Sequence, residues 1–166
     1  MTFDKPEKCS TIPDVVADDE IILRSADTRH FNKKGNVKSN IFKPPFGSRE
    51  VSVMRFHYMS IGECKMRGKE IACKAKHDFK GFAALKCAAI RKAKAEIEDS
   101  RKHFLGHADI VYSNPRPPEA LPNCAPEDLQ AIIAFEEVVD QLVNSCKLFF
   151  DRNPTSEDWQ GEEIIL

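Results

Sequence analysis

The strongest constraint on the fold is an apolar stripe near the C-terminal end of this 166-residue chain. Its members recur at steps of three and four residues, the period of a helix with one buried face: Ile132, Phe135, Val139, Leu142, Cys146 and Phe149. Pro126 suits a first helical turn. The pattern stops before Asn153-Pro154 and spans too few heptads for a coiled coil. It therefore predicts a core helix packed on a sheet, from 126 to about 152.

A second long helix is expected from Phe79 to about Ser100, because its apolar residues share one helical stripe and it is rich in alanine. Shorter apolar runs predict strands at 20–24, 50–58, 68–76 and 104–112. Residues 40–43, which precede two prolines, suit a short edge strand or an extended segment. Residues 60–64 are ambiguous and could start a short helix.

These elements predict an α+β fold. We expect a small mixed or antiparallel sheet of four or five short strands, covered by two long amphipathic helices. The chain length suits a single domain over residues 1–166, with an irregular leader at 1–19 and an apolar C-terminal tail at 160–166.

Composition favours a cytoplasmic protein. The 25 basic and 26 acidic residues give a net charge of −1, which does not indicate nucleic-acid binding. No stretch has the apolar length of a signal peptide or a membrane span. The six cysteines include no C-x-x-C pair and are read as reduced. No phosphate-binding loop or complete set of metal ligands occurs, so neither a cofactor nor a metal is expected.

Four polar residues are candidates for catalysis. His107 and Asp109 are two positions apart in the strand predicted at 104–112, so they share one face. There they could orient each other, bind a metal, or act as base and orienter, or else form a structural pair. Arg24 ends an apolar run and could hold a phosphate or carboxylate, or pair with Asp27. His30 follows in the polar loop.

Two further groups are candidates for binding. The loop at 25–39 carries a basic cluster that suits an anion, although a solvated loop explains it too: Arg29, Lys33, Lys34 and Lys38. The chain ends on Ile164, Ile165 and Leu166, which could add a short strand or dock into a partner's groove.

Two loose resemblances concern the enzyme alternative. Arg101 and His107 match the R-x(4–6)-H pattern, which resembles HEPN ribonucleases, where these two residues act on the scissile phosphate. That family is all-helical, whereas the N-terminal half here favours strands. The arrangement of Arg24, His30-Phe31 and a later strand with Ser52 resembles small ADP-ribosyltransferase-like toxins, in which an early arginine grips a diphosphate. No catalytic glutamate can be matched.

Two functional hypotheses follow. The first is a cytosolic interaction or regulatory subunit that works through its surface and its C-terminal tail, within a larger complex with a protein partner. The alternative is a small enzyme that acts on a nucleotide or another phosphate-bearing substrate, ADP-ribosyltransferase-like or ribonuclease-like. Its site would comprise Arg24, His30, His107 and Asp109.

Overall fold

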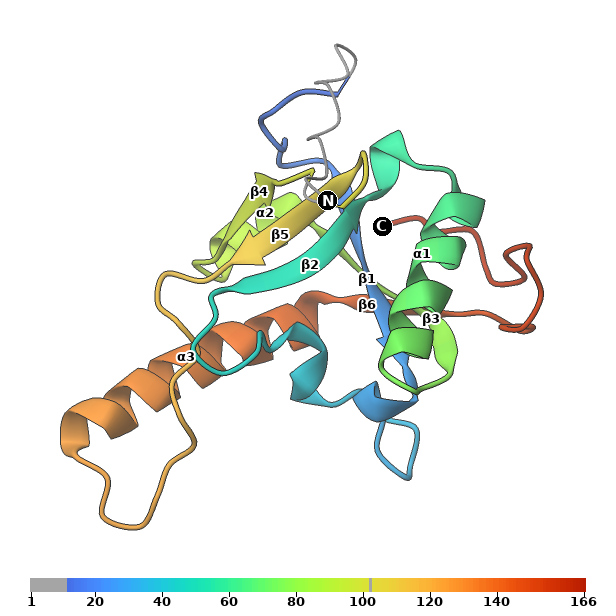
Figure 1. The fold of residues 1–166 in the computed structure, drawn as a ribbon. Helices are drawn as coiled ribbons and strands as arrows, with labels where there is room; N and C mark the ends of the chain where they lie inside the picture. The colour runs from blue at the N-terminus through green and yellow to red at the C-terminus, as the bar shows by residue number, and fades with distance from the viewer. Residues whose placement is uncertain (1–11, 102) are drawn as a thin grey trace, which may run out of the picture.

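An antiparallel sheet forms the centre of the computed structural model, which describes residues 12–101 and 103–166 (Figure 1). Within these ranges its six strands run in the order β4-β5-β2-β1-β3-β6. Their bounds are β1 Ile21–Asp27, β2 Glu50–Arg55, β3 Phe79–Lys86, β4 Glu96–Asp99, β5 His107–Val111 and β6 Lys147–Phe150. The helices are α1 Ile61–Lys74, α2 Cys87–Lys92 and α3 Pro126–Ser145. The fold is therefore α+β. None of the helices in the described ranges is long and apolar enough to cross a membrane.

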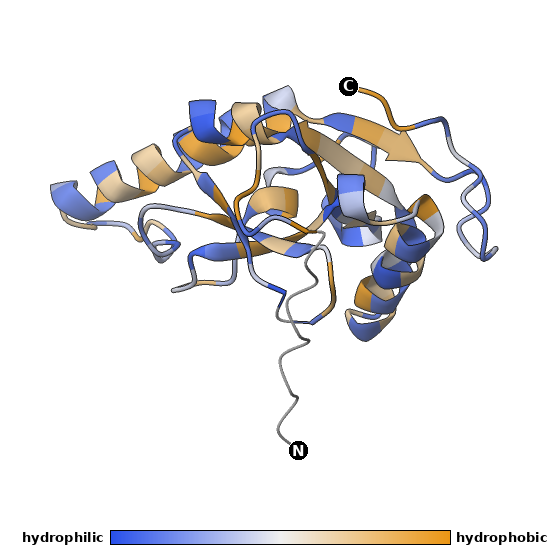
Figure 2. Cartoon of the chain, turned by 90° about the horizontal axis from the view of Figure 1, so that it is seen from above, coloured by the Kyte–Doolittle hydropathy of each residue, from blue (hydrophilic) through white to orange (hydrophobic). Residues whose placement is uncertain are grey.

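The sheet separates two apolar cores, as the alternation of strand side chains requires. On one face α2, α3 and the 3-10 turn Ser39–Phe42 cover Ile22, Val53 and Ile110. On the other face α1 and the C-terminal segment cover Leu23, Met54 and Phe82. Apolar colours mark stretches of the strands and the end of the chain (Figure 2).

The sheet opens between its two central strands. β1 pairs with β3 over its whole length, but with β2 only through Ile22↔Arg55 and Leu23↔Met54. Beyond that point Arg24 bridges the opening, because its Nε donates to the Ile41 carbonyl at 2.9 Å and its Nη1 to the Ser52 carbonyl at 3.0 Å. The guanidinium thus replaces the missing backbone pairs.

A buried arginine joins the residues before β1 to the sheet. Arg55 is fully buried and donates to both carboxylate oxygens of Glu20, at 2.9 and 2.6 Å, and to Asp99 at 2.6 Å. It also donates to the Pro13 carbonyl, and Val16 lies in the core. The described part of the predicted leader is therefore packed against the sheet.

A buried lysine holds the segment after β6. The Nζ of Lys65 on α1 lies 2.7 Å from Asp151 Oδ2, and both side chains are completely buried. The same nitrogen donates to the Asn153 carbonyl and the Ser156 hydroxyl, each at 3.0 Å. This ion pair fixes the C-terminal segment on α1.

The strand predicted at 68–76 is wrong, because these residues belong largely to α1. Ser60 and Glu63 form a reciprocal capping box that starts the helix. The buried face of α1 is only partly apolar, since it includes Lys65 and Gly68, so its helical period is weak in the sequence.

The long helix predicted from Phe79 to about Ser100 is also wrong, since the segment holds β3, α2 and β4. β3 lies between β1 and β6 and is buried on both faces, which hides the alternation of a strand. Pairing on both sides overrides the helix preference of its alanines. Gly81 fits here because a Cβ would lie 2.0 Å from the Phe149 carbonyl oxygen of β6.

The remaining differences are smaller. The predicted C-terminal helix is α3 but ends at Ser145, and its last residues form β6. Residues 40–43 are not an edge strand, because the 3-10 turn allows consecutive Ile41 and Phe42 both to enter the core. The strand expected at 50–58 ends at Arg55, before the 3-10 turn Phe56–Tyr58. Three of the predicted strands are kept as β1, β2 and β5, and β3, β4 and β6, which lie where helices were expected, bring the described sheet to six strands.

Candidate functional site

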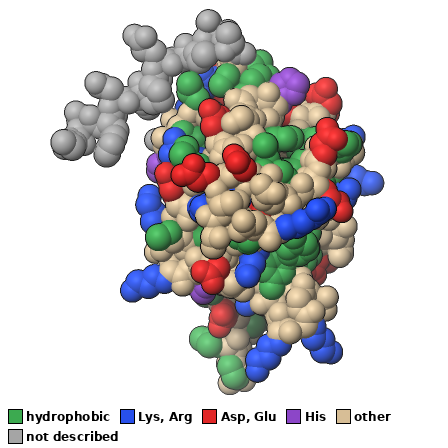
Figure 3. All heavy atoms as spheres, turned by 90° about the vertical axis from the view of Figure 1, so that its right-hand side faces the viewer, with side chains coloured by type: hydrophobic (Ala, Val, Ile, Leu, Met, Phe, Trp, Pro, Cys, Tyr) green, Lys and Arg blue, Asp and Glu red, His purple; other side chains and the backbone are tan. Residues whose placement is uncertain are grey.

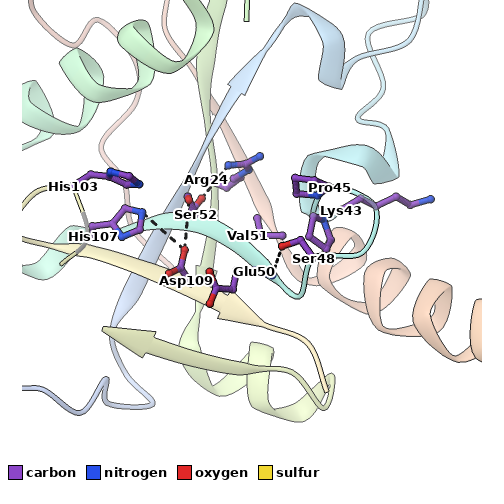
Figure 4. A pocket seen from close by; sticks show the side chains of 11 residues that line it. Arg24, Lys43, Pro45, Ser48, Glu50, Val51, Ser52, His103, His107 and Asp109 are labelled. Atoms are coloured by element: carbon purple, nitrogen blue, oxygen red, sulfur yellow. Dashed lines mark hydrogen bonds and ion pairs between the residues drawn. The ribbon is translucent and has the colours of Figure 1, made fainter. Parts of the chain in front are cut away.

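Residues from three strands gather at a pocket of about 350 Å³ (Figure 4). Arg24 comes from β1, Ser52 from β2, and His107 and Asp109 from β5. β2 also contributes Glu50 and Val51. The segment after the 3-10 turn Ser39–Phe42 and the loop before β5 complete the walls with Lys43, Pro44, Pro45, Ser48 and His103. Three of the four predicted catalytic residues therefore line one pocket.

His107 and Asp109 project from the same face of β5, as strand alternation predicts. The distance from His107 Nε2 to Asp109 Oδ1 is 3.9 Å, and the side chains are only 3% and 5% exposed. The other ring nitrogen, Nδ1, forms a hydrogen bond with the Ser100 hydroxyl. The hydrogen bond to Ser100 fixes the imidazole, so that Nε2 is the nitrogen that faces Asp109.

Ser52 reaches the same carboxylate, since its hydroxyl donates to Asp109 Oδ1 at 3.4 Å. The carboxylate thus lies between the serine and His107. A serine nucleophile needs the imidazole as its immediate neighbour, so this order is not that of a catalytic triad. The arrangement instead suits a carboxylate that orients His107.

His103 adds a second imidazole at the pocket. Its ring lies edge-on to that of His107, with centroids 5.1 Å apart, and it is exposed. The ring of Phe104 also packs against that of His107, with the two centroids 5.3 Å apart.

Over the part of the chain that the structure describes, no group of three or more histidine, cysteine or acidic side chains is placed to hold a metal ion.

Arg24 provides the pocket with a fixed cation. Its two hydrogen bonds go to backbone carbonyls and not to Asp27, the partner considered from the sequence. Burial, with a contribution from Arg29, lowers the pKa of Arg24 to about 10, so it stays charged at neutral pH. The two bonds use two of its five N–H groups, and neither of them involves Nη2, so Arg24 retains donors for a ligand.

His30 does not line this pocket. It is buried, and its Nδ1 accepts a hydrogen bond from the Asp27 backbone nitrogen at 3.0 Å, within a capping box. Burial lowers the pKa of His30 to about 4 despite the neighbouring Asp27 carboxylate, so the ring is neutral at pH 7. Its position is that of a structural cap at the end of β1.

The predicted anion-binding cluster is divided. Arg29 donates to both carboxylate oxygens of Asp27, each at 3.1 Å. Lys33, Lys34 and Lys38 are exposed around the small loop closed by the Phe31↔Val37 bridge, and none of them lines the pocket at Arg24.

The C-terminal tail packs on its own chain. Ile164 is buried in the core beneath α1, and Leu166 packs against that core, while Ile165 is exposed. Arg101, which resembled the arginine of the HEPN pattern, donates to Asp99 at 2.8 Å and to the Ile12 carbonyl. It thus supports the leader, and the antiparallel sheet differs from the all-helical fold of that family.

Sequence reasoning missed Lys43 and Ser100. Lys43 lines the pocket 2.7 Å from Glu136 of α3, and nothing in its local sequence indicates either contact. Ser100 meets His107 because β4 and β5 are adjacent antiparallel strands. Its position would have followed from that pairing, had β4 been predicted.

The surface around α1 carries no large patch of one charge. On the side of the molecule that bears α1 and the C-terminal segment, acidic and basic side chains are interspersed (Figure 3). On this face no broad field of one sign would therefore attract a charged ligand.

No protein-family model matches the chain, and comparisons with curated proteins and with solved structures likewise give no match.

Proposed function

We propose that this protein is a small enzyme that acts on a phosphate-bearing substrate in the pocket at Arg24. The observation that carries the proposal is the meeting of a fixed guanidinium, an oriented imidazole and a carboxylate, from three strands, at one open pocket. Charged and titratable groups that converge in a pocket are the usual signature of a catalytic site.

Arg24 is the phosphate-binding group in this proposal. The carbonyls of Ile41 and Ser52 fix its plane, so little side-chain entropy is lost when a ligand binds. Its partly buried charge interacts with a phosphate oxygen more strongly than an exposed lysine would. Lys43 and His103 add positive or ionisable groups at the rim.

The histidines move protons in the proposed hydrolysis. His107, oriented by Asp109, takes a proton from water as the water oxygen forms its bond to phosphorus. The bond from phosphorus to the leaving oxygen breaks, and His103 gives that oxygen a proton. To complete the cycle, the exposed His103 takes up a proton from solvent and His107 releases the proton that it gained, which restores both rings. Each positioned proton donor or acceptor contributes about 10²- to 10⁴-fold to such a reaction.

The test is turnover of p-nitrophenyl phosphate, bis(p-nitrophenyl) phosphate and a panel of nucleotides by the full chain. We expect His107→Gln to lower kcat/KM at least about 100-fold with an unchanged melting temperature. His57→Gln is the matched control, because His57 is exposed and outside the pocket. Failure to hydrolyse any compound, or equal activity of the two variants, would contradict the proposal.

A second candidate function, that of an interaction or regulatory subunit, is favoured by α3. The first half of this helix extends beyond the sheet in both views (Figures 1 and 2). Leu129 and Ile133 are 44 and 50% exposed there, and Leu121, in the loop before the helix, is 72% exposed. The helix carries five carboxylates and no Lys or Arg, which complements a basic segment with apolar residues. The tail serves this function less well, since Ile164 is buried in its own chain.

Fluorescence anisotropy with a labelled amphipathic peptide of leucine and lysine tests this second function. We expect salt-sensitive binding that is lost in Leu129→Asp and kept in Ile165→Asp, the matched change in the tail. If only Ile165→Asp abolishes peptide binding, the docking site lies at Ile164–Leu166 and not on α3. If neither variant changes peptide binding, neither surface is the docking site.

A cytoplasmic, reducing setting is part of the proposal. Cys64, Cys73, Cys87, Cys124 and Cys146 are free thiols. Burial raises the pKa of Cys64 and of Cys87 to about 12, so these two behave as inert core residues.

A further inference from the structure

A second pocket of about 440 Å³ adjoins the first and shares four residues with it: Arg24, Ser52, His103 and His107. It lies between α1 and the opening that separates β1 from β2. Both volumes fall within the range of small-molecule sites. Because Arg24 and His107 belong to both, one ligand can extend from the first pocket into the second.

The chemistry of this second pocket differs from that of the first. Met54 and Ile71 give it apolar walls, and Phe104 adds an aromatic ring. The guanidinium of Arg67 stacks on Phe104 at 4.6 Å and so holds the ring in place. Apolar and aromatic walls suit the flat faces of a heterocyclic base.

Beyond the residues that the two pockets share, α1 supplies charged groups to the second one. Glu70 and Lys74 are four residues apart and therefore lie on one side of the helix. Arg67 Nη1 holds the Glu70 carboxylate at 3.3 Å. A carboxylate is acceptor-only, so it suits the exocyclic amino group of a base.

We infer that the substrate is a nucleoside monophosphate with an amino-bearing base, whose phosphate lies at Arg24 and whose base lies between Ile71 and Phe104. This inference rests on the proposed function and specifies its substrate class. Glu70 distinguishes cytosine and adenine from uracil, because uracil presents carbonyl oxygens where cytosine and adenine present an amino group.

Calorimetric titration of the full chain with inorganic phosphate, ribose 5-phosphate, UMP, CMP and AMP tests the inference. We expect CMP or AMP to bind at least about tenfold more tightly than ribose 5-phosphate and than UMP. Glu70→Gln should abolish the preference for the amino-bearing base while leaving phosphate affinity unchanged. Glu157→Gln, an exposed carboxylate remote in sequence, is the matched control.

The outcomes separate the two proposals. If phosphate, ribose 5-phosphate and the nucleotides bind equally, the base pocket is refuted while the phosphate site stands. If the nucleotides bind but Glu70→Gln changes no preference, the proposed role of Glu70 is refuted. If none of the compounds binds, the proposed function itself fails, and the substrate class fails with it.

Discussion

Replacing Lys65 with methionine should destabilise the protein strongly. Methionine keeps the volume and the apolar stem of lysine but removes the cation that lies 2.7 Å from Asp151. Both side chains are fully buried, so the substitution leaves a carboxylate without its charge partner. Breaking one side of such a pair costs about 3–5 kcal/mol. The carbonyls of Asn153 and Asp158 lose a donor as well.

Urea denaturation measures this cost. With an m-value of about 2 kcal/mol/M, a loss of about 4 kcal/mol moves the midpoint by about 2 M. Lys69→Met is the matched control, because Lys69 lies one turn further along α1 and contacts the same segment through the Thr155 and Ser156 carbonyls, without a carboxylate. We expect it to cost less than about 1 kcal/mol.

A double substitution separates the charge from the packing. Lys65→Met with Asp151→Leu removes both buried charges, and we expect it to recover a large part of the lost stability. The reasoning is refuted if Lys65→Met costs no more than Lys69→Met, or if the double variant is as unstable as the sum of the single ones.

Three further predictions concern other parts of the chain. Gly81→Ala should destabilise β6 pairing severely and lower the melting temperature, because its Cβ would lie 2.0 Å from the Phe149 carbonyl oxygen; a melting temperature within error of wild type would contradict the geometry. For His30, the folded pKa of about 4 lies below the ordinary 6.5, so the unfolded chain takes up the proton first as the pH falls. Stability should therefore decrease by about 2–3 kcal/mol between pH 6.5 and 4 in denaturation curves, and His30→Gln should reduce this slope. At pH 8 the exposed Cys73 should react with a thiol reagent in the native state, whereas Cys64 should react only at the rate of unfolding, which mass spectrometry of the labelled chain can follow.

Local signals predicted the parts of the fold that depend on local chemistry. The stripe through Phe135, Val139 and Leu142 is buried in α3 because one face of that helix meets the sheet. The strand carrying His107 and Asp109 also agrees with the structure, as does their shared face. Both patterns depend on residues close together in sequence and on a clear contrast between their two sides.

The other elements depend on contacts that no local pattern contains. β3 has no polar side, since it pairs with both β1 and β6, and its alanines therefore suggest a helix. α1 buries Lys65, whose partner Asp151 is distant in sequence, and this makes the helix look irregular. The capping box of Ser60 and Glu63 was the available signal.

The candidate site was partly predictable for the same reason. His107 and Asp109 follow from strand alternation alone. Arg24 lines the pocket because β1 and β2 separate beyond Leu23, a feature of register that one strand cannot reveal. His30 was misplaced because the chain turns after Asp27, and its ring folds back to cap that turn.

The strand order also determines how quickly this chain can fold. Ile22 must find Leu85, and Gly81 must find Phe150, before the half of the sheet formed by β1, β3 and β6 exists. Each pairing closes a long loop of the chain. The conformational entropy of that loop is lost before neighbouring contacts form and offset the cost. Folding should therefore take milliseconds to seconds, as in proteins dominated by distant pairings, and not the microseconds typical of small helical bundles. During that time the β3 segment, apolar on both faces, is exposed to other chains, so refolding yield should decrease as protein concentration rises.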